Sequence, residues 1–210
     1  YYGFTNISTV FNFTDFLPSD NPTVKTFNTL QDEFGGGFGE TTSVLIETDN
    51  VATPEIHNAL IDSINNLSDV DNVLVFAGNA AAESVVGKLG AMLAPPSASP
   101  QAPPQMPDMA LIGQLTGYGV QLMNGQGLDA LRVSDSGNVE GLYNYLLQTD
   151  YDLFSTSLYV DETSTISAMQ VRITTSAGTS GAAQIRDDLY IAFKPLSDLG
   201  VFVGVTSDNI

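Results

Sequence analysis

The chain has 210 residues, 43% of them hydrophobic, so it can bury a sizeable core, and its composition argues against disorder of the whole. Six basic residues against 24 acidic residues give a formal net charge of -18, which repels phosphate backbones and anionic membrane surfaces and argues against nucleic-acid binding. The absence of cysteine excludes disulfides, thiol nucleophiles and cysteine metal sites, and it leaves the redox compartment open.

Residues 1–22 are an aromatic, partly apolar lead-in that ends in the turn signals Leu17-Pro18 and Asn21-Pro22. It lacks the basic start and apolar middle of a signal peptide, and no window reaches the roughly 18 to 20 apolar residues that cross a bilayer. The chain begins without Met, which we interpret as excision from a longer protein. Apolar residues at helical spacing then predict a short helix over 23–34, which ends in three glycines.

The next segment predicts a strand, a helix and a strand. The β-branched run at 43–48 is typical of a buried strand. Thr53, Pro54 and Glu55 supply an N-cap, a first-turn proline and a first-turn acid for a helix over 54–67. A second buried strand is expected over 72–78, and a right-handed crossover makes the two strands parallel.

Residues 79–150 are a predicted helical excursion. It contains helices over 80–93, 108–123 and 138–147, with a proline-rich extended connector over 94–107. A glycine-rich loop separates the last two helices.

The remaining residues, 151–210, return to strand character. The stretch 152–176 predicts a hairpin that turns at Asp161 to Thr165, and a helix over 178–196 precedes a strand over 200–208. The order predicts an α+β fold, a ferredoxin-like split βαβ sandwich with a helical insertion after its second strand. Strands 43–48, 72–77, 166–174 and 200–206 are expected in one sheet, with both crossover helices on the same face. The expected units are a lead-in at 1–22, two half-domains at 23–78 and 151–210, and the insertion at 79–150.

The sequence contains no complete catalytic motif. The only histidine, His57, is expected to face solvent or to cap the crossover helix. Gly178 to Gly181 falls one residue short of a nucleophile elbow and is interpreted as a helix N-terminus. The glycine-rich stretch at 34–40 lacks the Lys-Ser/Thr of a phosphate loop. We therefore predict no catalytic residues and no cofactor.

Paired acids occur at Asp69/Asp71, Asp161/Glu162 and Asp187/Asp188. None has EF-hand spacing, and solvated carboxylate pairs are expected in so acidic a chain, so no metal site is predicted.

The insertion is the preferred place for ligand contact, because flexible apolar side chains gather around its connector and adapt to varied hydrophobic ligands. Packing of the insertion on the sheet is the alternative role for each of them. The candidate residues are Met92, Met106, Met109, Leu111, Leu115, Leu122 and Met123.

Four segments resemble the extracytoplasmic porter domains of RND superfamily exporters, especially the archaeal, MMPL-like branch. They are "FTDFLPSDNPTVKTFNTLQDEFG", "SVLIETDNVATPEIHNALIDSINNLSDVDNV", "YVDETSTISAMQVRI" and "IRDDLYIAFKPLSDLGVFVGVTSDNI". In that family the first segment follows a membrane helix, and the last precedes the next one. The chain departs from the family at Thr206-Ser207-Asp208, where Thr-Gly-x-Pro is common.

The resemblance implies a non-catalytic extracytoplasmic domain of a cell-membrane protein that exports hydrophobic or amphiphilic solutes or lipids with an ion gradient. Its own transmembrane domain and a second porter loop are the implied partners, and homo-oligomers stay open. The alternative is a free-standing acidic extracellular binding or adhesion module. The transported compound, the coupling ion, the choice between first and second loop, and glycosylation at Asn6, Asn12 or Asn66 are left open.

Overall fold

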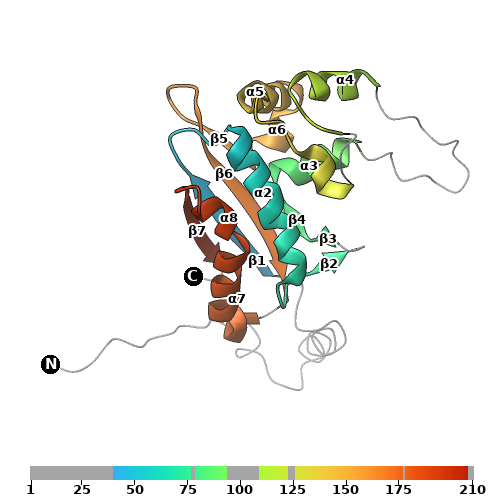
Figure 1. Cartoon of the computed structure of the whole chain (residues 1–210). Coiled ribbons are helices and arrows are strands. Elements are labelled where there is room, and N and C mark those ends of the chain that lie inside the picture. Colours follow the sequence, from blue (N-terminus) through green and yellow to red (C-terminus); the bar gives the residue numbers. More distant parts are fainter. Residues whose placement is uncertain (1–39, 77–78, 94–108, 123–125, 177, 208–210) are drawn as a thin grey trace, which may run out of the picture.

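The computed structural model describes residues 40–76, 79–93, 109–122, 126–176 and 178–207. The lead-in, the helix expected over 23–34 and the proline-rich connector lie outside the described residues, as do Met106 and Met123. The described part combines helices with an antiparallel sheet, so the expected α+β class is confirmed (Figure 1).

The main sheet has the strand order β4-β6-β1-β7, and every pair in it is antiparallel. Its strands are β1 (Glu40–Glu47), β4 (Ala82–Glu83), β6 (Ile166–Thr175) and β7 (Phe202–Ser207), and β5 (Leu158–Val160) also pairs with β6. In the central row Val44 lies opposite Val171 and Val205. Side chains alternate between faces, so Val44 and Ile46 are buried whereas Leu45 is exposed.

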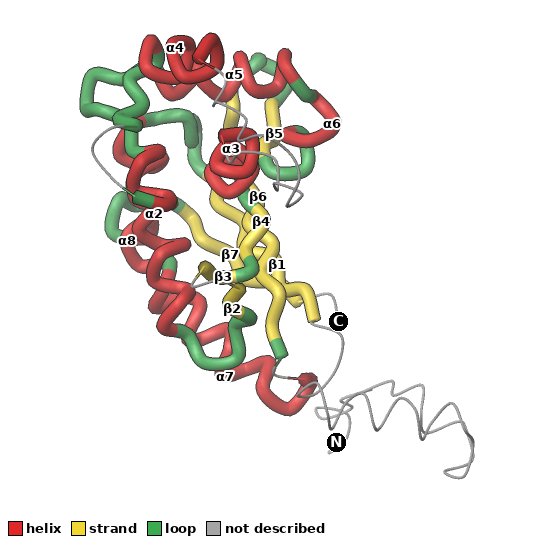
Figure 2. Tube along the Cα trace, turned by 90° about the vertical axis from the view of Figure 1, so that its right-hand side faces the viewer, coloured by secondary structure: helices red, strands yellow, loops and turns green. Residues whose placement is uncertain are grey.

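Three helices cover one face of this sheet: α2 (Pro54–Asn66), α7 (Gly178–Ala192) and α8 (Lys194–Ser197). Figures 1 and 2 show them on the same side, and α2 contacts both α7 and α8. The prediction that both crossover helices share a face is therefore confirmed. The Thr53 hydroxyl accepts a hydrogen bond from the Ile56 N–H at 3.4 Å, so the predicted N-cap is also present.

The strand expected over 72–78 is wrong as an uninterrupted buried element. Val73 bridges Thr175 and the Leu74 N–H donates to Thr174, but the chain then leaves the sheet as a short hairpin of β2 (Val75–Phe76) and β3 (Asn79–Ala80). It returns at Ala81, whose carbonyl accepts from the Thr174 N–H, and continues as β4. Among the described strands β4 lies at the edge of the sheet and pairs only with β6, so a hairpin can interrupt this strand without breaking an inner ladder.

The crossover has the expected direction. Because β4 and β1 are each antiparallel to β6, they run the same way, although β6 lies between them.

The predicted hairpin is present as β5 and β6, but its first strand is shorter than expected. Residues 151–154 form a helical turn instead of strand, because the Asp150 side chain caps it by accepting a hydrogen bond from the Leu153 N–H at 3.0 Å. At the turn of the hairpin the Asp161 carboxylate accepts hydrogen bonds from the N–H groups of Thr163 at 2.8 Å and Thr165 at 2.9 Å. Such side-chain to backbone bonds are what make Asp a good turn residue.

The insertion forms a cap of short helices at one end of the sheet (Figure 1). They are α3 (Val85–Leu93), α4 (Met109–Gly117), the 3-10 helix η3 (Gly127–Leu131) and α5 (Val139–Thr149), and α6 (Tyr151–Phe154) comes directly after the insertion. Two predicted helices are too long. Residues 79–83 are strands, so α3 begins only at Val85, and α4 ends before Gly119, which has φ +96° and approaches Gly137 so closely that a Cβ would lie 2.8 Å from its Cα.

Buried residues of the sheet, the crossover helices and the insertion belong to one apolar cluster. Phe193, where α7 meets α8, and Tyr143 of α5 are both fully buried in it. The insertion is therefore packed on the rest of the fold through a shared core.

We expect Phe193→Ala to lower the free energy of unfolding by about 3–5 kcal/mol, because it leaves a cavity in this core. Phe202→Ala is the matched control, since Phe202 is 58% exposed on the opposite face of the sheet. Its cost should stay below about 1 kcal/mol, a strand-surface effect. Urea unfolding of both variants measures the difference, and equal losses would contradict the assignment of Phe193 to the core.

Candidate functional site

A groove lies between α2 and the insertion. Its volume is about 420 Å³, and its lining is mostly apolar. The ten lining residues include no charged side chain, in a chain whose net charge is -18. They are Ile64, Asn65, Ser68, Asn79, Ala80, Ala82, Gly87, Gly90, Gly127 and Leu128.

Two glycines of α3 keep this groove open. Gly87 and Gly90 are three residues apart and so lie on the same face of the helix. A Cβ on Gly90 would lie 3.5 Å from a Leu131 methyl and 3.9 Å from a Leu128 methyl, which is ordinary contact. A longer side chain at Gly90 would therefore project into space that the groove now contains.

A buried histidine joins the insertion to α2. His57 has no exposed surface; its Nε2 lies 2.9 Å from the Leu131 carbonyl, and its Nδ1 lies 2.8 Å from the Tyr143 hydroxyl. A carbonyl only accepts, so Nε2 carries the proton and donates to Leu131, and Nδ1 accepts from the tyrosine O–H. One neutral imidazole thus links α2 with η3 and α5.

The expectation that His57 faces solvent is therefore wrong. His57 stands three, four and seven residues before Leu60, Ile61 and Ile64, which places it on the apolar face of α2. That spacing was visible in the sequence. The sequence did not show that α5 and η3 supply one partner for each ring nitrogen.

Burial sets the protonation of this link. It lowers the pKa of His57 from 6.5 to about 4, and the positive charge of Arg132 adds to the shift, while the hydrogen bond to Leu131 opposes it. Burial also raises the pKa of Tyr143 well above its ordinary value. Both groups are therefore neutral near neutral pH, and neither is placed to exchange protons with a solute in solvent.

Polar contacts beside His57 also hold residues 129–133 of the insertion against α2. Asn58 donates to the Val133 carbonyl at 2.8 Å and accepts from the Val133 N–H at 2.9 Å. Arg132 pairs with Asp62 of α2 and with Asp129. Residues 129–133 thus follow α2 closely, and they come directly after Gly127 and Leu128, which line the groove.

A buried lysine holds the other wall. Lys88 of α3 is 8% exposed, and its ammonium donates at 2.8 Å to the Leu153 carbonyl and at 2.8 Å to the Ser157 hydroxyl, with a further bond to Thr156. It also pairs with Glu83 at 2.8 Å. These bonds anchor α3 to the segment that connects α6 with β5.

Five of the predicted ligand residues lie in the described part of the chain, and none of these five lines this groove. Leu115 is fully buried and belongs to the core, where an introduced charge would disrupt folding. Met92, Leu111 and Leu122 are half-buried against the core, and Met109 is 70% exposed. Large flexible side chains indicated a ligand site in the sequence, whereas the groove is lined by small residues such as glycine and alanine.

Other chemistry has little support among the described residues. No group of three His, Asp or Glu side chains is close enough to hold a metal ion there. The described helices include none that is long and apolar enough to cross a membrane. Gly178 begins α7, as expected for a helix N-terminus.

Comparison with known proteins finds no family model that matches the chain, and no curated protein matches it either.

The buried histidine predicts a loss of stability on mild acidification. Because the folded pKa of about 4 lies below the unfolded value of 6.5, the unfolded chain binds the proton first as the pH falls. His57's contribution is complete above about pH 6.5 and is lost down to about pH 4. From about pH 7 to about pH 5 the loss from this residue should be about 2 kcal/mol.

Urea unfolding of wild type and His57→Gln at both pH values isolates this loss, because the carboxylates contribute equally to both proteins. The free energy of unfolding of the wild type, relative to that of His57→Gln, should fall by about 2 kcal/mol from the higher pH to the lower. An advantage that does not change with pH would show that His57 is not buried in its neutral form.

Proposed function

We propose that this chain is a non-catalytic extracytoplasmic porter domain of an RND-type exporter of the MMPL-like branch. In this proposal the groove between α2 and the insertion receives the apolar part of a hydrophobic or amphiphilic solute. Energy comes from an ion gradient acting on a membrane domain outside this chain. The observation that carries the proposal is the connectivity of the sheet.

The connectivity fits a ferredoxin-like split βαβ sandwich of the porter type. Strands β1 and β4 are joined through α2 and have β6 between them, while β6 and β7 are joined through α7 and have β1 between them. Two interleaved βαβ units of this kind define the split arrangement. The helices of the insertion follow this second strand, as the order of elements in the sequence predicts.

The points where the chain enters and leaves the sheet also fit a domain held between successive membrane helices. Chain direction is opposite in β1 and β7, and Thr42 lies opposite Ser207. The start of β1 and the end of β7 therefore leave the sheet side by side. A domain with adjacent ends can be inserted in a loop without spreading the elements on either side.

The groove suits an uncharged, apolar segment of ligand. It has no charged lining residue, and small side chains leave room for atoms of varied shape. The hydrogen bonds of His57, Asn58 and Lys88 hold its two walls from outside the cavity. Movement of the domain as a rigid body would therefore carry the groove with it.

A side chain that fills the groove should lower its affinity for an apolar ligand. We expect Gly90→Leu to weaken binding of the uncharged fluorophore N-phenyl-1-naphthylamine by about tenfold or more, because the leucine occupies the cavity. Gly113→Leu is the matched control, since a Cβ there meets nothing within 4 Å. Fluorescence titration measures both dissociation constants after circular dichroism shows that both variants are folded.

Unchanged affinity in folded Gly90→Leu would remove the groove from the proposal. A free-standing binding module could share the groove, so a second observation separates the two functions. The exporter requires apolar segments of roughly 18 to 20 residues encoded directly before Tyr1 and after Ile210. Reading the flanking gene sequence decides this, and polar flanks on both sides would favour the free-standing module.

A further inference from the structure

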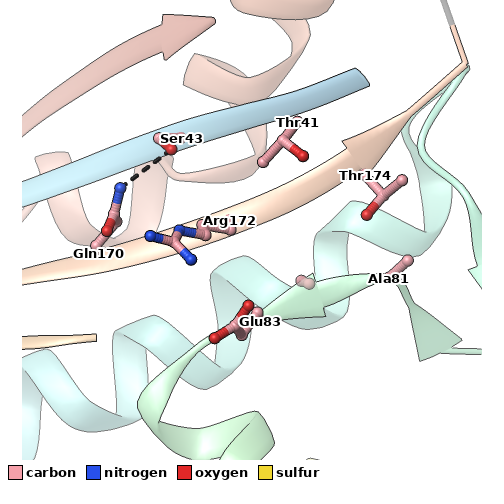
Figure 3. A pocket seen from close by; sticks show the side chains of 8 residues that line it. Thr41, Ser43, Ala81, Glu83, Gln170, Arg172 and Thr174 are labelled. Atoms are coloured by element: carbon pink, nitrogen blue, oxygen red, sulfur yellow. Dashed lines mark hydrogen bonds between the residues drawn. The ribbon is translucent and has the colours of Figure 1, made fainter. Parts of the chain in front are cut away.

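A second hollow lies on the face of the sheet opposite α2, α7 and α8. Its volume is about 520 Å³, and its lining comes from β4, β6, β1 and the residue before β4. The lining residues are Thr41, Ser43, Ala81, Ala82, Glu83, Gln170, Arg172 and Thr174. Figure 3 shows the side chains of this hollow on the three neighbouring strands.

Strand register places the charged groups together. Arg172 lies opposite Ser43 on one side and opposite Glu83 on the other, so the three form one row across the sheet. Figure 3 shows the Arg172 guanidinium between the other two side chains. In the next row Thr41 lies opposite Thr174. Directly opposed residues have their Cβ atoms about 5 Å apart, within reach of one small ligand.

The charges in this row do not cancel. The Glu83 carboxylate pairs with the buried Lys88 ammonium at 2.8 Å, and the hydrogen bond to Lys88 is the main cause that lowers the pKa of Glu83. The lysine thus compensates the glutamate. Among the described residues no carboxylate oxygen lies within 4.0 Å of the Arg172 guanidinium, so one positive charge remains in surplus.

Hydroxyl groups beside Arg172 add donors. The Gln170 side-chain amide donates to the Ser43 hydroxyl oxygen at 3.1 Å, so the Ser43 O–H hydrogen can turn toward the hollow. Thr41 and Thr174 contribute hydroxyls to the same lining. A planar guanidinium flanked by O–H donors matches a carboxylate, which guanidinium groups bind through two parallel hydrogen bonds.

We propose that this hollow binds the carboxylate of a small monoanionic molecule. Arg172 holds both carboxylate oxygens, the Ser43 hydroxyl donates to one of them, and the remainder of the molecule fills the space toward Thr41 and Thr174. A single surplus positive charge compensates a monoanion fully, whereas a dianion such as phosphate would keep one uncompensated negative charge beside the Glu83 carboxylate, which disfavours its binding. Carboxylate binding here is independent of any role in transport.

The test is an NMR titration with three probes at constant ionic strength: butyrate, its uncharged counterpart butanol, and inorganic phosphate. We expect butyrate to bind with a dissociation constant on the order of 1 mM, as befits a small ligand, and to shift the resonances of β1, β4 and β6. Butanol and phosphate should bind at least about tenfold more weakly, because one lacks the charge and the other carries too much.

Two arginine variants complete the test. Arg172→Gln should weaken butyrate binding by about tenfold or more. The butyrate affinity of Arg172→Lys should lie between those of Arg172→Gln and wild type, because lysine keeps the positive charge but lacks the two parallel N–H donors of a guanidinium. Arg186→Gln is the control for loss of charge, since Arg186 is an exposed residue of α7 that pairs with Asp187. Equal butyrate affinity in Arg172→Gln, or equal binding of butanol, overturns the site. Tighter binding of phosphate than of butyrate overturns the preference for a monoanion.

Discussion

The hydrogen bonds of His57 connect two parts of the fold that the chain builds separately. The ring accepts a hydrogen bond from the Tyr143 hydroxyl and donates one to the Leu131 carbonyl, so α2, α5 and η3 meet at a single buried side chain. An unpaired imidazole in this position would lack compensation for its lost hydration, a cost of about 1–3 kcal/mol. These hydrogen bonds hold the insertion against α2 and thereby fix the position of the groove wall that Gly127 and Leu128 supply.

The two faces of the sheet serve different ends because alternate residues of each strand point to opposite sides. On the helix side, Val44, Val171 and Ile173 are fully buried and carry the core. On the other side, Ser43, Gln170 and Arg172 line a polar hollow. Lys88 links the two regions, since its ammonium anchors α3 beside the groove and compensates the charge of Glu83 beside the hollow. The groove wall and the charge of the hollow therefore depend on the same side chain.

Local patterns predicted much of the fold and little of the site. The cap at Thr53 and the turn at Asp161 depend on residues only a few positions apart, and both appear as expected. The helix expected over 178–196 is divided at Phe193 into α7 and α8, because Pro195 has no N–H to continue the helical hydrogen bonds. The groove is lined by Gly87 and Gly90, and a sequence pattern shows glycine in a helix only as a weak helix former. Met and Leu side chains were predicted to contact ligand instead, although Leu115 is a core residue. Space left by a missing side chain cannot be inferred until the opposite wall is known.

By itself, the sequence determined the α+β class, the order of most elements, the hairpin and the shared face of the two crossover helices, because periodicity and turn chemistry are local properties. Only the tertiary structure decided the rest. The edge position of β4 allowed the interruption at Val75–Ala80, the packing of α5 and η3 buried His57, and strand register placed Arg172 beside Ser43 and Glu83. Each of these depends on contacts between residues far apart in the chain, whose partners no local pattern specifies.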